Sequence, residues 1–150
     1  MSQTNDPIAK AEILIRKPIA EVFNTFTQPN HITQFWFDKC SGPTEKDAYI
    51  EWNWTIFDMT IPVKVMSYKK NEIIIMSWGS GNDQSILEWS FTKRSEQTTY
   101  ISLINRDFQG NIDEKIATAL DSTGGFNLVI AAAKAYLEHG IKLNIVNDKF

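Results

Sequence analysis

Apolar and polar residues alternate along the middle of the chain, and the period of this alternation changes towards the C-terminus. Between residues 48 and 107, apolar side chains recur at every second position, which is typical of strands with one buried face. Short polar segments of hairpin length separate the successive runs, so the pattern predicts antiparallel strands. A further short strand is predicted over residues 11–16, ahead of Pro18.

A helical period predicts short helices directly after that first strand. Pro18 suits the first turn of a helix, and apolar residues then recur with helical spacing until Pro29. Asn30 can cap a second short turn over residues 31–34, ahead of the aromatic segment 35–37. We therefore expect two short helices between the first strand and the rest of the sheet.

The longest helical pattern covers residues 121–143. The polar residues Asp121, Ser122 and Thr123 are expected to cap its N-terminus, and Gly140 suits a left-handed C-terminal cap. The apolar stripe consists of Phe126, Val129, Ile130, Ala133 and Leu137, while Asn127, Lys134 and Glu138 are expected to point away from it. Because such a stripe needs a sheet to pack on, we predict an α+β fold, with a curved antiparallel sheet of about six strands packed on this helix.

Composition limits the class of protein. The 150 residues suit a single domain, 1–150, in which residues 1–9 are polar and expected to be loose. The net charge of -3 comes without a basic stripe, so binding to nucleic acid is not expected. Cys40 is the one cysteine, which excludes an internal disulfide and a Cys-rich metal site and favours a reducing compartment.

Targeting signals are not evident in the sequence. The N-terminus has neither the basic segment nor the apolar segment of a signal peptide. No apolar run approaches the ~20 residues that a membrane helix requires. We therefore expect a cytoplasmic protein without membrane insertion. Exposed strand edges could pair across a dimer, so the sequence is compatible with a monomer or a homodimer.

Several segments, taken in this order, resemble the activator of heat-shock-protein-90 ATPase homologue family. They are IRKPIAEVFNTFTQPNHITQFW at residues 15–36, IIIMSWG at residues 73–79 and DSTGGFNLVIAAAKAYLEHGIKLNIV at residues 121–146. The segment DFQG at residues 107–110 approximates the family's aromatic Gly-Phe piece. The family belongs to the START-like (SRPBCC) superfamily, so the resemblance, which runs from about Ala11 to Val146, implies a helix-grip fold of the START-like or Bet v-like kind.

The resemblance implies several kinds of function, because the superfamily includes lipid and hormone carriers, chaperone regulators and polyketide cyclases. We favour non-catalytic binding of a small hydrophobic or aromatic ligand between the sheet and the C-terminal helix. One alternative is a chaperone cofactor that acts through a protein interface. Another is a cyclase or isomerase, in which Asn105, Asp107 or His31 would have to supply a proton step.

The predicted cavity is defined by the inward faces of the strands and of the long helix. Its lining is expected to comprise Trp36, Trp52, Trp54, Val63, Trp78, Trp89, Phe91, Asn105, Asp107, Phe126, Ile130 and Ala133. Asn105 and Asp107 could orient a polar group of the ligand, or they could lie in solvent at a frayed strand end. The large aromatic side chains could also fill the interior and leave no cavity.

No metal or cofactor is expected from the sequence. His31 and His139 lie on different predicted elements, without cysteine or carboxylate partners at the spacing of a zinc site. Gly124 and Gly125 do not belong to a phosphate-binding fingerprint. A GxSxG motif that would expose a nucleophilic serine is also missing. These observations favour a protein without catalytic activity.

Overall fold

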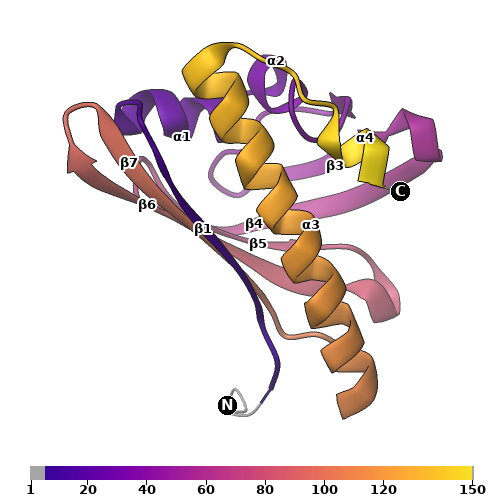
Figure 1. Cartoon of the computed structure of the whole chain (residues 1–150). Helices are drawn as coiled ribbons and strands as arrows, with labels where there is room; N and C mark the ends of the chain where they lie inside the picture. The colour runs from indigo at the N-terminus through magenta and orange to yellow at the C-terminus, as the bar shows by residue number, and fades with distance from the viewer. Residues whose placement is uncertain (1–5, 150) are drawn as a thin grey trace.

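The computed structural model describes residues 6–149, which form a curved sheet holding a long helix (Figure 1). The strands are β1 (Ala9–Ile15), β2 (Lys39–Cys40), β3 (Tyr49–Trp54), β4 (Met59–Lys69), β5 (Ile73–Trp78), β6 (Ser85–Ser95) and β7 (Thr98–Arg106). The helices are α1 (Ile19–Thr27), α2 (Pro29–Ile32), α3 (Ile112–His139) and α4 (Ile145–Lys149), and 3-10 turns lie at Thr55–Phe57 and Gly81–Asp83. Of the segment expected to be loose, residues 1–5 lie outside the described residues, whereas Ala9 is buried and already belongs to β1.

The sheet has seven strands in the order β1-β7-β6-β5-β4-β3-β2, and every neighbouring pair is antiparallel. Strands β3 to β7 follow one another as hairpins, as the alternation predicts, and β1 adds at the far edge with Ile13 opposite Ile101. The short strand β2 was not predicted, because two residues carry no readable period. The predicted α+β helix-grip fold is confirmed.

Side-chain alternation is confirmed on the regular strands and fails where the backbone turns. On β6, Leu87, Trp89 and Phe91 are buried on one face. By alternation Ile56 would continue the inward face of β3, but it lies in a 3-10 turn and is 64% exposed. This turn ends at Asp58, whose φ of 49° is left-handed, so the strand period stops before Ile56.

Proline within a strand usually marks a sheet edge or a bulge, but Pro62 marks neither. It lies in β4, between β3 and β5, and the bulge of that strand falls between Val65 and Ser67. The Pro62 carbonyl accepts a hydrogen bond from the backbone N–H of Gly79, just beyond the end of β5. In an antiparallel strand the nitrogen and the carbonyl of a residue point to the same side, so the Pro62 nitrogen also faces Gly79, where β5 has already ended. The missing N–H therefore removes no bond from the ladder of β4 and β5.

The predicted pair of short helices is confirmed, with one shift. In α1, Val22, Phe23 and Phe26 are buried at helical spacing. The helix α2 begins two residues earlier than expected, because Gln28 occupies its N-cap position and Asn30 lies inside it.

The N-terminus of α3 was predicted ten residues too late. The helix is capped by Asn111, whose side chain accepts a hydrogen bond of 2.9 Å from the N–H of Glu114. The Glu114 carboxylate accepts one of 3.0 Å from the N–H of Asn111, which completes a capping box. Residues 121–123 are therefore helix interior. The C-terminal prediction is confirmed, since Gly140 caps α3 with a φ of 64°.

Polar side chains of α3 close the free edge of β1. Lys134 donates to the carbonyl of Leu14 at 2.6 Å, and Asn127 donates to that of Lys10 at 3.2 Å. The Glu138 carboxylate accepts from the N–H of Arg16 at 2.8 Å and from the Lys134 ammonium at 2.6 Å. As predicted, these side chains point away from the apolar stripe of the helix. The sequence pattern did not show that they form hydrogen bonds with the unpaired backbone groups at the edge of β1.

By length and composition alone, α3 is the one helix among the described residues that could cross a membrane. In the fold it lies along the sheet (Figure 1), and its residues Val129, Ile130 and Ala133 are buried in the core. This is the position of a core helix.

Candidate functional site

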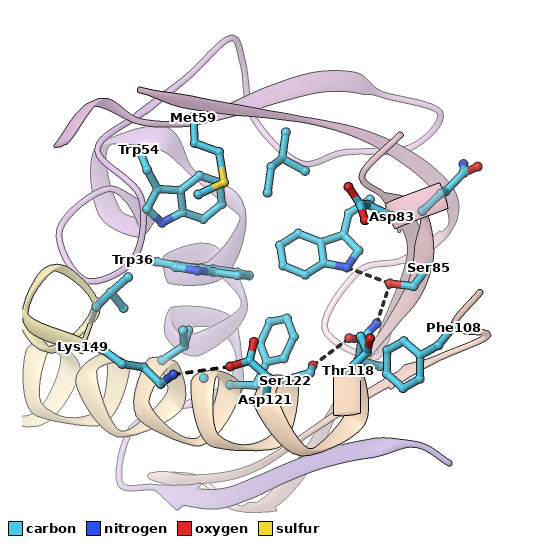
Figure 2. Close-up of a pocket in the computed structure, with 18 of the residues that line it drawn as sticks. Trp36, Trp54, Met59, Asp83, Ser85, Phe108, Thr118, Asp121, Ser122 and Lys149 are labelled. Atoms are coloured by element: carbon cyan, nitrogen blue, oxygen red, sulfur yellow. Dashed lines mark hydrogen bonds and ion pairs between the residues drawn. The ribbon is translucent and has the colours of Figure 1, made fainter. Parts of the chain in front are cut away.

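A pocket of about 510 Å³ lies between the sheet and α3, so the aromatic side chains do not fill the interior completely. Its walls come from the turn between β3 and β4, the end of β5, the segment 82–85, the end of β7 and two helices. Figure 2 shows Trp36, Trp54 and Met59 on one side of this space and Ser85, Phe108 and Ser122 on the other. The volume lies within the range of ~300–1,000 Å³ that is usual for small-molecule sites.

The structure places some of the predicted lining residues on the pocket wall and others behind it. Those on the wall are Trp36, Trp54, Trp78, Asn105 and Phe126. Those buried in the core, outside the wall, are Trp52, Val63, Trp89, Phe91, Ile130 and Ala133. The inward faces were assigned correctly, but alternation along a strand does not tell where the helix touches the sheet and where it stands away from it.

Asp107 was placed by alternation on the same side as Asn105, and this is wrong. The strand β7 ends at Arg106, and Asp107 has a φ of 61°, which turns the chain. Its exposed carboxylate accepts a hydrogen bond of 2.7 Å from the Arg106 guanidinium, outside the pocket. Asn105, by contrast, is only 2% exposed.

The apolar wall is made of packed rings. The Trp36 ring is the centre of this group, with ring centroids 5.7 Å from Phe126 and 6.4 Å from both Trp54 and Trp78. Behind it, Trp52 lies 4.8 Å from Trp36. Because neighbouring rings hold each indole in place, this wall is apolar and firmly packed.

A chain of hydrogen bonds crosses the opposite wall, and Figure 2 shows it as dashed lines. The indole N–H of Trp78 donates to Ser85 Oγ at 3.0 Å. The Asn105 amide nitrogen donates to Ser85 Oγ and to the carbonyl of Ile86, both at 2.9 Å. Ser122 Oγ donates to Asn105 Oδ1 at 2.7 Å. Apart from Ile86, each member of this chain lines the pocket.

Sequence reasoning missed Ser85 and Ser122. Ser122 was assigned to a helix cap, but with α3 starting at residue 112 it falls on the same face as Gly125, Phe126 and Val129, all on the pocket wall. The capping motif of Asn111 and Glu114 was the signal that could have corrected this. For Ser85, its position opposite Trp78 became known only from the strand register.

Charged groups lie at the rim of the pocket. The side chain of Asp121 is 77% exposed, and one of its oxygens lies 3.8 Å from Lys149 Nζ. Asp83, in the 3-10 turn before β6, is exposed as well. The charges thus meet solvent at the mouth, while the interior offers rings and neutral hydrogen-bonding groups.

The remaining candidate residues lie elsewhere. His31 Nδ1 is 2.8 Å from the Tyr136 hydroxyl, outside the pocket wall, and His139 is exposed in the last turn of α3. Burial raises the pKa of the half-buried Cys40 thiol, with a smaller opposing effect from the backbone N–H of Gly42. Over residues 6–149, no three His, Cys, Asp or Glu side chains gather as metal ligands would.

The fold matches solved structures of low sequence identity. SSP2350 from Staphylococcus saprophyticus has a TM-score of 0.77 at 23% identity, with 91% of this chain and 95% of that chain covered. DynU16, a putative protein of the dynemicin biosynthetic locus, has a TM-score of 0.76 at 19% identity, with 91% of this chain but 49% of that one covered. The Aha1 dimer from Colwellia psychrerythraea has a TM-score of 0.71 at 14% identity, covering 89% and 97%.

Such identities establish a shared fold and nothing more specific. No curated protein matches the sequence. The family model described as "Activator of Hsp90 ATPase homolog 1-like protein" matches residues 16–138, which include most of the sheet and nearly all of α3. The chain therefore belongs to the family of activator of Hsp90 ATPase homolog 1-like proteins.

Proposed function

We propose that this protein binds a small hydrophobic or aromatic molecule in the pocket beneath α3, without converting it chemically. The observation that carries the proposal is the pocket itself, about 510 Å³ in volume and walled mainly by apolar side chains. Small-molecule sites usually combine such a wall with a few polar groups that orient the ligand.

The arrangement of the wall supports an apolar ligand. Trp36, Trp54 and Phe126 are almost completely buried, yet each presents part of its ring to the pocket. A ligand that covers these rings removes the remaining apolar surface from water, at ~25 cal/mol per Å². The charged groups at the rim are the carboxylates of Asp83 and Asp121 and the ammonium of Lys149, which pairs with Asp121, so a net negative charge remains and a neutral molecule is favoured over an anion.

Binding without reaction is favoured by the titratable groups. Of the residues considered for a proton step, Asp107 and His31 lie off the pocket wall, and only Asn105 lies on it. The Asn105 amide does not titrate near neutral pH, and its nitrogen is already bonded to Ser85 and Ile86. The ligand is therefore held rather than protonated or deprotonated by these residues.

The test uses pyrene, a neutral apolar fluorophore, and a pair of adjacent glycines in α3. A Cβ on Gly125 would meet no atom within 4 Å, and this residue lines the pocket, so the side chain of Gly125→Leu extends into the empty space. Gly124 is equally unobstructed but exposed and off the pocket wall, which makes Gly124→Leu the matched control.

We expect pyrene to bind the wild-type protein and the Gly124→Leu variant with the same affinity, measured by its fluorescence and by energy transfer from tryptophan. The Gly125→Leu variant is expected to bind at least about tenfold more weakly, because lost contact area translates into affinity at ~1.4 kcal/mol per factor of ten. Equal binding by both variants, or none by the wild-type protein, would contradict the proposal.

Regulation of a heat-shock-protein-90 ATPase is the second candidate. It is favoured by the description of the family model that matches residues 16–138. The test adds purified protein to the chaperone and measures the ATPase rate, with the heat-inactivated protein as a control. An increased rate supports this function, and an unchanged rate together with no detectable binding removes it.

Cytoplasmic location and oligomeric state complete the proposal. The single thiol of Cys40 suits a reducing compartment. A dimer is known for the similar fold from Colwellia psychrerythraea. The free edge of β1 is occupied by side chains of α3, so a dimer of this chain would have to use another surface. Light scattering at increasing concentration distinguishes a monomer from a homodimer.

A further inference from the structure

We infer that the ligand carries one hydroxyl group, which accepts a hydrogen bond from Ser85 and donates one to Ser122. This inference rests on the proposed function and narrows it to a class of ligand: a neutral apolar ring system with a single hydroxyl. The argument depends on how the hydrogen-bond chain of the polar wall uses its donors and acceptors.

The orientation of the Asn105 amide is the first step. One of its amide hydrogens points to the carbonyl of Ile86 at 2.9 Å, and a carbonyl oxygen can only accept. Exchanging the nitrogen and the oxygen of the amide would place two acceptors against each other. The nitrogen of Asn105 is therefore fixed on the side of Ile86 and Ser85, and its oxygen on the side of Ser122.

The proton of Ser122 follows from this orientation. Asn105 Oδ1 is an acceptor, so the 2.7 Å contact with Ser122 Oγ requires the serine to donate. The hydroxyl of Ser122 has only one proton, and the contact consumes it. Towards the pocket, Ser122 consequently presents oxygen lone pairs, which means that it can accept but not donate.

Ser85 has the opposite character. Its Oγ accepts from the indole N–H of Trp78 at 3.0 Å and from the amide of Asn105 at 2.9 Å. Both of these partners can only donate, so the two lone pairs of the hydroxyl are occupied. Within residues 6–149 no acceptor receives the Ser85 proton, and Ser85 is buried on the pocket wall.

The pocket thus offers one donor and one acceptor, on either side of the same amide. A ligand hydroxyl matches both, because it accepts from Ser85 and donates to Ser122. A ketone or an ether uses only the donor. A carboxylate sets a negative charge against the lone pairs of Ser122, and Lys149 at the rim is already paired with Asp121.

The experiment compares four probes on the same ring system: 1-hydroxypyrene, 1-methoxypyrene, pyrene and pyrene-1-carboxylate. We expect 1-hydroxypyrene to bind the wild-type protein about tenfold more tightly than pyrene, because each of its two hydrogen bonds in a buried site contributes a modest binding free energy. The methoxy compound is expected to fall between these two, and the carboxylate to bind most weakly.

Variants assign the preference to the two serines. Ser85→Ala and Ser122→Ala are each expected to reduce the preference for 1-hydroxypyrene over pyrene to about threefold or less. If Ser85→Ala does not fold, Ser85→Thr is measured as well. It retains the hydroxyl and is expected to keep the wild-type preference for 1-hydroxypyrene over pyrene. Thr123→Ala is the control, because Thr123 follows Ser122 in α3, lies off the pocket wall and already donates to the carbonyl of Ala119 at 2.7 Å.

The outcomes separate the inference from the proposed function. Equal affinities for pyrene and 1-hydroxypyrene overturn the hydroxyl inference but leave the apolar pocket as a binding site. A preference that persists unchanged in both alanine variants overturns the assignment to Ser85 and Ser122. If none of the four probes binds, the proposed function and this inference both fail.

Discussion

The two halves of α3 meet the same sheet in different ways. In the C-terminal half, Val129, Ile130, Ala133 and Leu137 are buried, and polar side chains bond to the edge of β1. In the N-terminal half, Ala119 is the only residue of α3 before Phe126 that is buried. The outer face of that half exposes apolar side chains: Ile112, Ile116 and Leu120, the last of them 71% exposed.

This difference determines where the pocket lies. Beyond Val129, which still lines the pocket, small side chains such as Ala132 and Ala133 let the helix approach the sheet closely, so no space remains there. The N-terminal half stands over rings that it does not cover, and the space between becomes the pocket. Gly124 and Gly125 lie at the boundary, where a Cβ on either would meet nothing within 4 Å. One helix thus contributes to a packed core and to the wall of a pocket.

The largest expected effect is on the free energy of unfolding, and it compares two tryptophans of β3: Trp52 in the packed core and Trp54 on the pocket wall. Trp52 is stacked on Phe37 at 4.6 Å in the packed core, so Trp52→Ala is expected to lose about 3–5 kcal/mol of unfolding free energy. Trp54 faces the pocket on one side, so Trp54→Ala is expected to lose clearly less unfolding free energy than Trp52→Ala. Urea unfolding of both variants measures the difference, and equal losses would contradict the contrast between the regions.

Ala133 tests how tightly the C-terminal half is packed. It is completely buried, with an exposed fraction of 0%, so Ala133→Phe forces a ring into filled space. Overpacking of this kind is expected to cost about 1–3 kcal/mol of unfolding free energy. Pyrene affinity, measured on the folded fraction, should stay within about twofold of wild type. A stable variant that no longer binds pyrene would place the pocket under the other half of the helix.

The edge of β1 is the next smaller test. Lys134→Met keeps the length of the side chain but removes the donor to the Leu14 carbonyl and the ion pair with Glu138. We expect a loss of about 1–2 kcal/mol of unfolding free energy, together with faster amide hydrogen exchange in β1. Lys142→Met, an exposed lysine beyond the end of α3, is the control. An equal loss of unfolding free energy in Lys134→Met and Lys142→Met would show that the bond to the edge of β1 does not stabilise the fold.

Gly124 tests the boundary between the halves. Since Gly124 has an ordinary helical φ and its hypothetical Cβ meets no neighbour, Gly124→Ala should raise the unfolding free energy by up to ~1 kcal/mol through helix propensity. Thermal unfolding measures the gain. A destabilised variant would show that the backbone at this position needs the freedom of glycine.

The smallest effect is a dependence of stability on acid pH. Burial raises the pKa of Glu138, but hydrogen bonds from Lys134 and from the N–H of Arg16 outweigh it, and the net pKa lies below its usual value of 4.5. A lowered pKa means that Glu138 stabilises the fold above pH 4.5 and that this contribution fades as the pH falls through the folded-state pKa. Glu138→Gln should show a weaker loss of stability between pH 6 and pH 3 than the wild type, in urea unfolding.

Much of the fold could be predicted because the spacing of apolar residues and the residues that begin or end an element are local features of the sequence. The alternation of β6 and the left-handed cap at Gly140 follow from neighbouring residues alone. The start of α3 was misplaced because Asp121, Ser122 and Thr123 have the composition of a cap, although the Asn111 capping motif was equally present. Two capping signals of similar strength were therefore present, and the sequence alone did not show which of them begins the helix.

The pocket was harder to predict because it depends on how two elements lie against each other. Alternation identified Trp52 and Trp54 as inward, but only their position relative to α3 separates core from pocket wall. The end of β7 could not be found from period either, since the left-handed backbone at Asp107 reverses the chain within one residue. Ser85 and Ser122 are distant in sequence and meet only through Asn105.

The edge of β1 also has a consequence for synthesis of the chain. This strand leaves the ribosome before the other strands of the sheet, yet it pairs with residues 99–105 of β7, and its contacts with α3 close over 117 to 122 residues. Contacts of such long range form late in folding. Until then the apolar run from Ile13 to Ile15 has no partner, and the charges of Lys10, Glu12 and Arg16 beside it act as gatekeepers that oppose association between nascent chains.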